Sequence, residues 1–380
     1  MASLLDSLRG TSQVDCDTMD AEGIPANIIQ HRSSTQFLTE KWLRNSVHLS
    51  TALPTRYFYA RHHTHQPDSL TQLHPRAGNC LFRADQGKPR YQCAASQGPH
   101  QRSYSRCQGP LSSLQGSATF EEFVVEISMV KLQLRLIQHV TGFIHVQTNP
   151  KLAYSTASTV ENAKRIVGIF KSLSHADPKR VCVKIPSTWE GLQACRILEA
   201  EAIATLATTM FCMEQAALAA AAGCTYIAPY VNELRVHFEQ GYVDGSKGFE
   251  FCRQAQAYYA RHACRTQVLA ASLTSVDEVM QLAGVQHITI APKLLGELSA
   301  RRASSWGAPL GAYFAQRPLD NWCETTDCQT ILGDESSWRL AFTRSGFGAS
   351  EGKMIQAINY FSDFQDKIED LVSASAKLAT

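Results

Sequence analysis

The most reactive side chain that this sequence offers is a lysine inside an apolar strand. The run Val181-Cys-Val-Lys-Ile-Pro186 surrounds Lys184 with apolar residues and ends at a proline. Alternation puts Cys182 and Lys184 on one face, and both faces are otherwise apolar, as in a parallel strand covered on both sides. Burial disfavours the ammonium form, and the uncharged amine is the nucleophile that forms Schiff bases with carbonyl compounds. We therefore predict a catalytic role for Lys184; the alternative is a lysine that snorkels to solvent or pairs with a carboxylate.

Schiff-base chemistry also needs groups that move protons, and the ends of other predicted strands supply them. Asp17 lies at the end of the first predicted strand and can accept a proton. Gln147, Thr208 and Tyr230 lie in or at the ends of later strands and can each hydrogen-bond a water. Ser272 follows a further strand. Each of these side chains alone is a weak signal, because polar residues at strand ends are often structural.

The elements that would position these residues alternate between strand and helix. We predict strands at 13–17, 28–34, 141–147, 181–186, 205–211, 225–231, 266–271 and 286–290, and helices at 120–139, from Ser158, and at 188–202, 213–222, 247–262, 275–283 and 293–301. Short loops between these units predict parallel pairing. A (β/α)8 barrel fits the number of strands best, and an open doubly wound sheet is the alternative. Since no glycine-rich phosphate loop follows any strand, nucleotide binding is disfavoured.

Two sequence patterns predict helix starts, and a third predicts a long final helix. Ser187-x-x-Glu190 and Ser158-x-x-Glu161 both have the spacing of a capping box. Residues 350–374 carry one apolar stripe that includes Met354 and Phe361. We expect this last helix to pack across the exterior or the mouth of the barrel.

The chain divides into four segments of different character. Residues 1–48 hold the first two predicted strands, 116–301 hold the main barrel, and 302–380 form a C-terminal extension with the long helix. Residues 49–115 carry eight Lys/Arg, two Asp and no Glu, without apolar periodicity. Such a segment buries too little apolar surface to offset its ordering entropy. We expect it to be disordered, or an aberrant insertion such as an unspliced stretch of the gene.

Composition excludes several classes of protein. A net charge of +2 argues against a dedicated nucleic-acid binder, and no apolar run is long enough to span a membrane. Without a secretory signal, the twelve cysteines are expected to be unpaired thiols in the cytoplasm. Neither the pair Cys323 and Cys328 nor the group of histidines at 62, 63, 65 and 74 has partners at ligand spacing, so we expect no metal and no cofactor.

Several of these motifs together resemble the transaldolase family. The octapeptide Lys184-Ile-Pro-Ser-Thr-Trp-Glu-Gly191 is very similar to the lysine motif of that family. The run His145-Val-Gln-Thr-Asn-Pro150 resembles the third strand in the fungal-type branch of the family. Leu206-Ala-Thr-Thr-Met-Phe211, Ile227-Ala-Pro-Tyr-Val-Asn232 and Val268-Leu-Ala-Ala-Ser272 resemble the next three strands. The resemblance covers about 120–300, with Asp17-Thr-Met-Asp20 near the start.

This resemblance implies a (β/α)8 enzyme that transfers a dihydroxyacetone unit between sugar phosphates, as in the pentose phosphate pathway. Lys184 would form the imine, and Asp17 would take the proton of the C4 hydroxyl. Thr208 and Gln147, with Tyr230, would hold the catalytic water. Substrate contacts are expected from Ser272, Asn232, Arg235 and Thr35. A homodimer is a candidate assembly.

Five residues that depart from the family pattern keep alternatives open. Gln147 and Tyr230 match the related fructose-6-phosphate aldolases rather than most transaldolases, which favours direct aldol cleavage as an alternative. Glu233 and Thr274 stand where cations for the substrate phosphate are expected, and Arg235 would compensate only if it turned inward. Thr35 replaces an Asn in the second strand. Together with the unusual segment 49–115, these changes leave a catalytically impaired relative as a third possibility.

Overall fold

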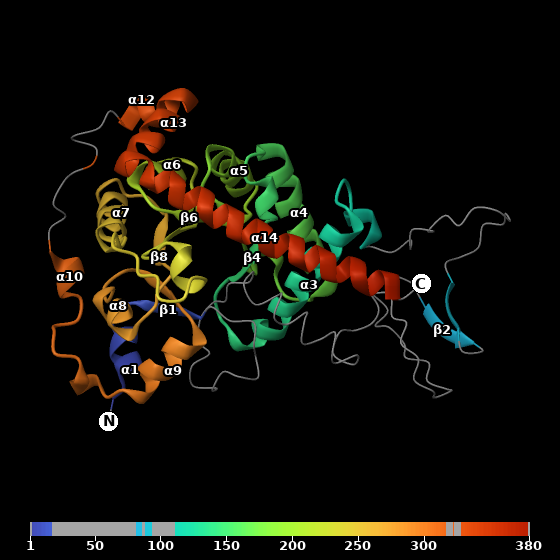
Figure 1. The fold of residues 1–380 in the computed structure, drawn as a ribbon, viewed down its shortest axis with the longest axis horizontal. Coiled ribbons are helices and arrows are strands. Elements are labelled where there is room, and N and C mark those ends of the chain that lie inside the picture. The colour runs from blue at the N-terminus through green and yellow to red at the C-terminus, as the bar shows by residue number, and fades with distance from the viewer. Residues whose placement is uncertain are drawn as a thin grey trace.

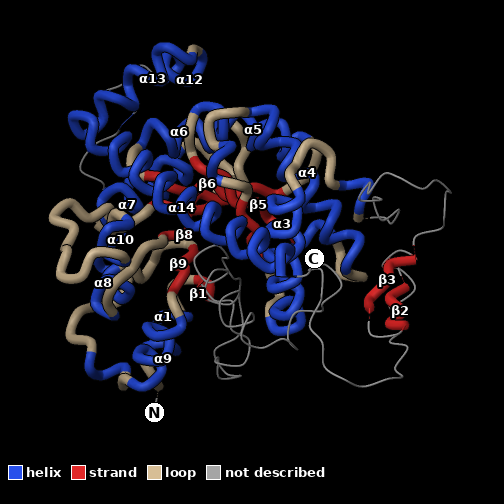
Figure 2. The backbone as a smooth tube through the Cα atoms, turned by 45° about the vertical axis from the view of Figure 1, so that its right-hand side comes forward, coloured by secondary structure: helices blue, strands red, loops and turns tan. Residues whose placement is uncertain are grey.

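Seven parallel strands form a single sheet in this computed structural model. It describes residues 2–16, 81–85, 88–92, 111–316, 322 and 328–378. The strand order is β1-β9-β8-β7-β6-β5-β4, and every neighbouring pair is parallel. The strands are β1 Gln13–Cys16, β4 Ile144–Gln147, β5 Val181–Pro186, β6 Ala204–Met210, β7 Tyr226–Pro229, β8 Gln267–Ala270 and β9 His287–Ile290. They curl into a half-barrel, and Figure 2 shows them in the middle of the molecule with helices around them.

Helices follow the strands along the chain and cover the outside of the sheet. The α-helices are α1 Leu4–Arg9, α3 Phe120–Leu136, α4 Thr156–Leu173, α5 Trp189–Ala200, α6 Met213–Ala221, α7 Phe249–Arg261, α8 Val276–Gln281, α9 Pro292–Ala300, α10 Ala312–Ala315, α12 Cys328–Gly333, α13 Glu335–Arg344 and α14 Ala349–Leu378. Short 3-10 turns are η1 Ser112–Leu114, η2 Ile137–His139, η3 Pro150–Leu152, η4 Pro178–Arg180, η5 Leu234–His237, η6 Ala303–Ser305 and η7 Ser345–Gly348.

Alternation along the strands separates two apolar clusters. Outward residues of β5, such as Val183 and Ile185, join the large cluster between the sheet and its helices. Inward residues make a second cluster, which contains Cys182, Leu206 and Tyr226. Lys184 therefore shares its strand face with the inner cluster, as the pattern of the strand predicted.

The (β/α)8 class is confirmed. Seven of the eight predicted strands are present, and each helix predicted between residues 120 and 301 has a counterpart. The predicted strand 28–34 lies outside the described residues. Of the segment 49–115, the structure describes the antiparallel hairpin of β2 Leu81–Asp85 and β3 Lys88–Gln92, and residues 111–115. The four-part division of the chain and the disorder of this segment stay predictions.

Both predicted capping boxes are wrong by one to three residues. Helix α5 is capped by Thr188, whose hydroxyl accepts from the Gly191 N–H, and α4 is capped by Ser155. The Ser187 hydroxyl instead donates to the Thr208 carbonyl at 2.6 Å and ties β5 to β6. A hydrogen bond between neighbouring strands has thus taken the side chain that local spacing assigned to the cap.

The long helix α14 crosses the mouth of the half-barrel rather than its exterior. It contacts η3, which follows β4, and η5, which follows β7, as well as β6 itself. Figure 1 shows it running in red from α13 to α3, across β4 and β6. Ala357 and Phe361 of α14 belong to the inner apolar cluster with Tyr230. The helix therefore covers the carboxyl ends of the strands.

Two further observations concern membrane-spanning helices and the state of the cysteines. Within the described residues, no helix is both long and apolar enough to cross a membrane. The cysteines whose side chains the structure describes are free thiols, among them the fully buried Cys182, Cys195 and Cys224.

Candidate active site

Lys184 lies at the carboxyl-terminal half of β5, enclosed by the sheet. It is 9% exposed, and the residues on both sides of it, Val183 and Ile185, are fully buried. Its Cα pairs with Gln147 of β4 on one side and with Leu206 of β6 on the other. An amine in this position is largely removed from water, which is the condition that favours a nucleophilic lysine.

The three predicted water-binding residues lie on β4, on β6 and just after β7, and β4 and β6 are the strands beside β5. Gln147 ends β4 and is 1% exposed, and Thr208 on β6 is fully buried. The Thr208 hydroxyl donates to the Tyr230 phenol oxygen at 3.2 Å. Gln147, Lys184 and Thr208 share the inward-facing side of β4, β5 and β6, so the sheet brings the predicted groups to one edge.

The loops after β7 and β8 are joined by a polar cluster around Ser272. Ser272 has a left-handed backbone (φ 62°), and its hydroxyl lies 2.9 Å from His237 Nε2. Asn232 Nδ2 donates to the Ser272 carbonyl at 2.8 Å and to Glu278 Oε2 at 3.0 Å. Desolvation of the ring lowers the pKa of His237, while the Glu278 charge opposes this. His237 is therefore a neutral hydrogen-bonding partner of Ser272 near neutral pH.

The residues expected at a phosphate site carry negative charge or are already paired. Glu233 is 7% exposed, and its carboxylate accepts from the Tyr242 phenol. The Arg235 guanidinium does not turn inward; it binds Glu239 through two hydrogen bonds of 2.9 and 2.7 Å. The hydroxyl of Thr274 donates to Glu278 at 3.1 Å.

Asp17 and Thr35 lie outside the described residues. Asp17 follows directly after β1, whose inward residue Asp15 is 1% exposed and lies 3.2 Å from His287 Nδ1. The histidines at 62, 63, 65 and 74 and Cys323 also lie outside the described residues. Among the residues that the structure does describe, His, Cys, Asp and Glu make no cluster suited to a metal ion.

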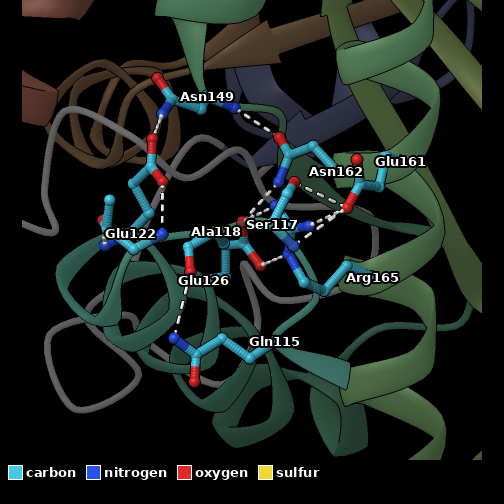
Figure 3. Close-up of polar contacts among 10 residues, drawn as sticks. Gln115, Ser117, Ala118, Glu122, Glu126, Asn149, Glu161, Asn162 and Arg165 are labelled. Atoms are coloured by element: carbon cyan, nitrogen blue, oxygen red, sulfur yellow. Dashed lines mark hydrogen bonds and ion pairs between the residues drawn. The ribbon is translucent and has the colours of Figure 1, made fainter. Parts of the chain in front are cut away.

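A buried ionic cluster beside β4 was missed by the sequence reasoning. Glu126 of α3 binds Arg165 and Asn162 of α4, and Asn162 accepts from the backbone N–H of Asn149 just after β4 (Figure 3). Glu126 is 3% exposed, and burial raises the pKa of its carboxyl although Arg165 opposes the rise. The available signal was this glutamate next to Ile127 on the apolar face of its helix, because a charge buried there needs a partner.

Comparison with known proteins is consistent with this arrangement. The family model "Transaldolase/Fructose-6-phosphate aldolase" matches residues 95–331, well over half of the chain. A transaldolase of Chlamydia trachomatis is 34% identical over 66% of this chain and 75% of the relative, and that of Chlamydia felis is 34% identical over 67% and 76%. The transaldolase of Chlamydia pneumoniae is 34% identical over 46% of this chain. That match spans about half (55%) of the relative's length. The chain belongs to the transaldolase/fructose-6-phosphate aldolase family.

Proposed function

We propose that this chain is a transaldolase-type enzyme that transfers a dihydroxyacetone unit between sugar phosphates through a Schiff base on Lys184. The observation that carries the proposal is the enclosed Lys184 amine, flanked by Gln147 and by the hydrogen-bonded pair Thr208 and Tyr230. Family membership supports the same chemistry.

The proposed reaction begins when the uncharged Lys184 amine adds to the ketone carbon of the donor. Loss of one water gives the imine. Asp17, directly after β1, takes the proton of the C4 hydroxyl, and the C3–C4 bond breaks to leave the enamine on Lys184 and a free aldehyde. The enamine carbon then attacks the acceptor aldehyde, Asp17 returns the proton, and water releases the ketose product. Gln147 and Thr208 hold the water that carries protons during these steps.

Substrate contacts are proposed from four residues. Ser272 and Asn232 lie together after β8 and β7, where their hydroxyl and carboxamide can face sugar hydroxyls. Arg235 would bind a phosphate by exchanging Glu239 for it. Thr35 would contribute from the second predicted strand.

Trapping with borohydride tests the proposal directly. Reduction in the presence of fructose 6-phosphate should attach the donor fragment to Lys184, as read by peptide mass spectrometry. Lys184→Ala should lose both the adduct and turnover. A Lys184→Ala protein that still transfers dihydroxyacetone would overturn the proposal, and measurable transfer by the purified wild type would remove the alternative of an impaired relative.

A second candidate activity is direct aldol cleavage, which the hydrogen bond between Thr208 and Tyr230 favours. The phenol adds a polar group at the water site, and water is what releases the bound fragment. Release of free dihydroxyacetone from fructose 6-phosphate without an acceptor would support this activity. If no free dihydroxyacetone forms and the unit appears in a new ketose only when an acceptor aldehyde is present, transfer is the activity.

A cytoplasmic location and a homodimeric assembly are part of the proposal. The free, buried thiols support a reducing compartment. Cell fractionation tests the location, and sedimentation at several protein concentrations tests the assembly.

A further inference from the structure

The carboxyl end of β4 carries Gln147, and its position depends on contacts from two sides. In the described part of the sheet, β4 has a strand neighbour on one side only, β5. From that side, the Thr148 N–H donates to the Lys184 carbonyl at 3.0 Å. This bond connects the residue after Gln147 to the backbone of the reactive lysine.

On the other side, helices α3 and α4 hold the same segment. The Asn149 backbone N–H donates to Asn162 Oδ1 at 2.7 Å, and its side chain donates to Glu122 at 3.2 Å. Figure 3 shows Asn149 reached from both helices. Asn162 is fully buried, so this contact is not exchanged with solvent.

The orientation of Asn162 is itself fixed by an ion pair. Asn162 Nδ2 donates to Glu126 Oε1 at 2.6 Å. Arg165 binds both oxygens of Glu126, at 2.7 and 2.8 Å. Because the backbone N–H of Asn149 can only donate, the carboxamide of Asn162 presents its oxygen to Asn149 and its Nδ2 to Glu126. A buried ion pair of this kind contributes little net stability compared with apolar packing, so its value lies in the geometry that it fixes.

Gln147 is the group that this geometry serves. Its side chain is 1% exposed, and its Nε2 has no hydrogen-bond partner among the described residues. One residue, Thr148, separates Gln147 from Asn149. A shift of the Asn149 backbone would therefore also move the Gln147 side chain, which is proposed to hold the catalytic water.

We propose that Asn162, with Glu126 and Arg165, is a positioning cluster for Gln147 and sets the rate of proton transfer at the imine. The inference rests on the proposed Schiff-base function. The cluster touches no substrate and acts through the backbone of Asn149. It should therefore change how fast the imine forms and hydrolyses, and leave its equilibrium amount unchanged.

The test measures the build-up of borohydride-trapped Lys184 after mixing with fructose 6-phosphate, separating rate from final amplitude. Asn162→Ala should slow the rate at least tenfold with unchanged amplitude, as should Gln147→Ala. The double variant should be no slower than either single one, because both changes remove the same effect. Glu126→Gln keeps the shape of the side chain and an acceptor oxygen, so it should slow the rate by a smaller factor, again with unchanged amplitude. It replaces Asn162→Ala in the test if that variant does not fold.

The matched control is Arg180→Met at the opposite end of β4. Arg180 donates to the Gly142 carbonyl at 3.1 Å, and so supports the same strand away from Gln147. It should reduce amplitude through unfolding and leave the rate unchanged. Equal slowing by Arg180→Met, or a reduced amplitude at wild-type rate in Asn162→Ala, would overturn the inference. Absence of any wild-type adduct at Lys184 would instead refute the proposed function.

Discussion

At the scale of single residues, the site combines a dry amine with neutral polar groups and little positive charge. Lys184 has uncharged Gln147 and Thr208 on the neighbouring strands. Each of these two groups can hydrogen-bond a water. Near β7 the cation Arg235 is bound to Glu239, and Glu233 is held by Tyr242. Under the proposed function, chemistry at the imine and recognition of a phosphate would depend on different residues.

Replacing Glu233 by Arg should strengthen binding of phosphorylated substrates. The change exchanges a negative for a positive charge at the end of β7, where a phosphate dianion would otherwise be repelled. We expect KM for fructose 6-phosphate to fall about tenfold, which corresponds to ~1.4 kcal/mol of binding energy. Steady-state kinetics with phosphorylated and unphosphorylated ketoses measure the change. Glu201→Arg, after the end of α5, is the control for charge alone; an equal fall in KM there would refute a local effect.

At the scale of elements, sequence periodicity predicted the strands and helices well and their contacts poorly. Residues alternate along β5 as expected, because period-two burial is a local property. The Ser187 hydroxyl could not be assigned from spacing, since its partner, Thr208, lies on another strand. The partner of Arg235 could be predicted, because Glu239 follows four residues later, at the spacing of a helical ion pair.

Glu278 at the start of α8 should make stability depend on acid pH. Burial alone would raise its pKa, but the Lys247 ammonium, the Thr274 N–H and Asn232 outweigh it, so the pKa lies below its usual value. The folded protein thus binds this proton less readily than the unfolded chain. Its stabilisation is complete above about pH 4.5, the usual value, and is lost as the pH falls through the lowered pKa.

Glu278→Gln should therefore lower the free energy of unfolding by about 2 kcal/mol at pH 7, because buried donors lose a charged acceptor. The difference from wild type should shrink as the pH falls from 5 towards 3.5. Urea unfolding at several pH values measures it. Glu201→Gln, in an exposed pair with Lys164, should cost far less. A wild-type difference that stays constant across this range would contradict the assignment.

At the scale of the whole molecule, one C-terminal helix closes the mouth of a half-barrel built mostly from the middle of the chain. The apolar stripe of α14 was predictable, and Met354, Ala357 and Phe361 are buried as expected. The sequence left two locations open for this helix, the exterior and the mouth, because an apolar stripe shows which face of a helix is covered and not what covers it. The same limit hid the link between Lys353 and Asp244, which are 109 residues apart in sequence.

The ion pair between Lys353 and Asp244 should hold α14 over the mouth. Lys353 Nζ lies 3.0 Å from Asp244 Oδ2, and the two side chains are 17% and 3% exposed. Lys353→Met keeps the packing stem and removes the charge, which leaves Asp244 buried with fewer donors at a cost of about 2 kcal/mol. Amide exchange in residues 349–378 should accelerate, while Lys367→Met, an exposed site on the same helix, should leave it unchanged. Adding Asp244→Asn to Lys353→Met should recover part of the protection from exchange, since the unpaired charge is then gone. If Lys353→Met and the wild type exchange equally fast, the ion pair does not hold the helix, and apolar packing that includes Phe361 does.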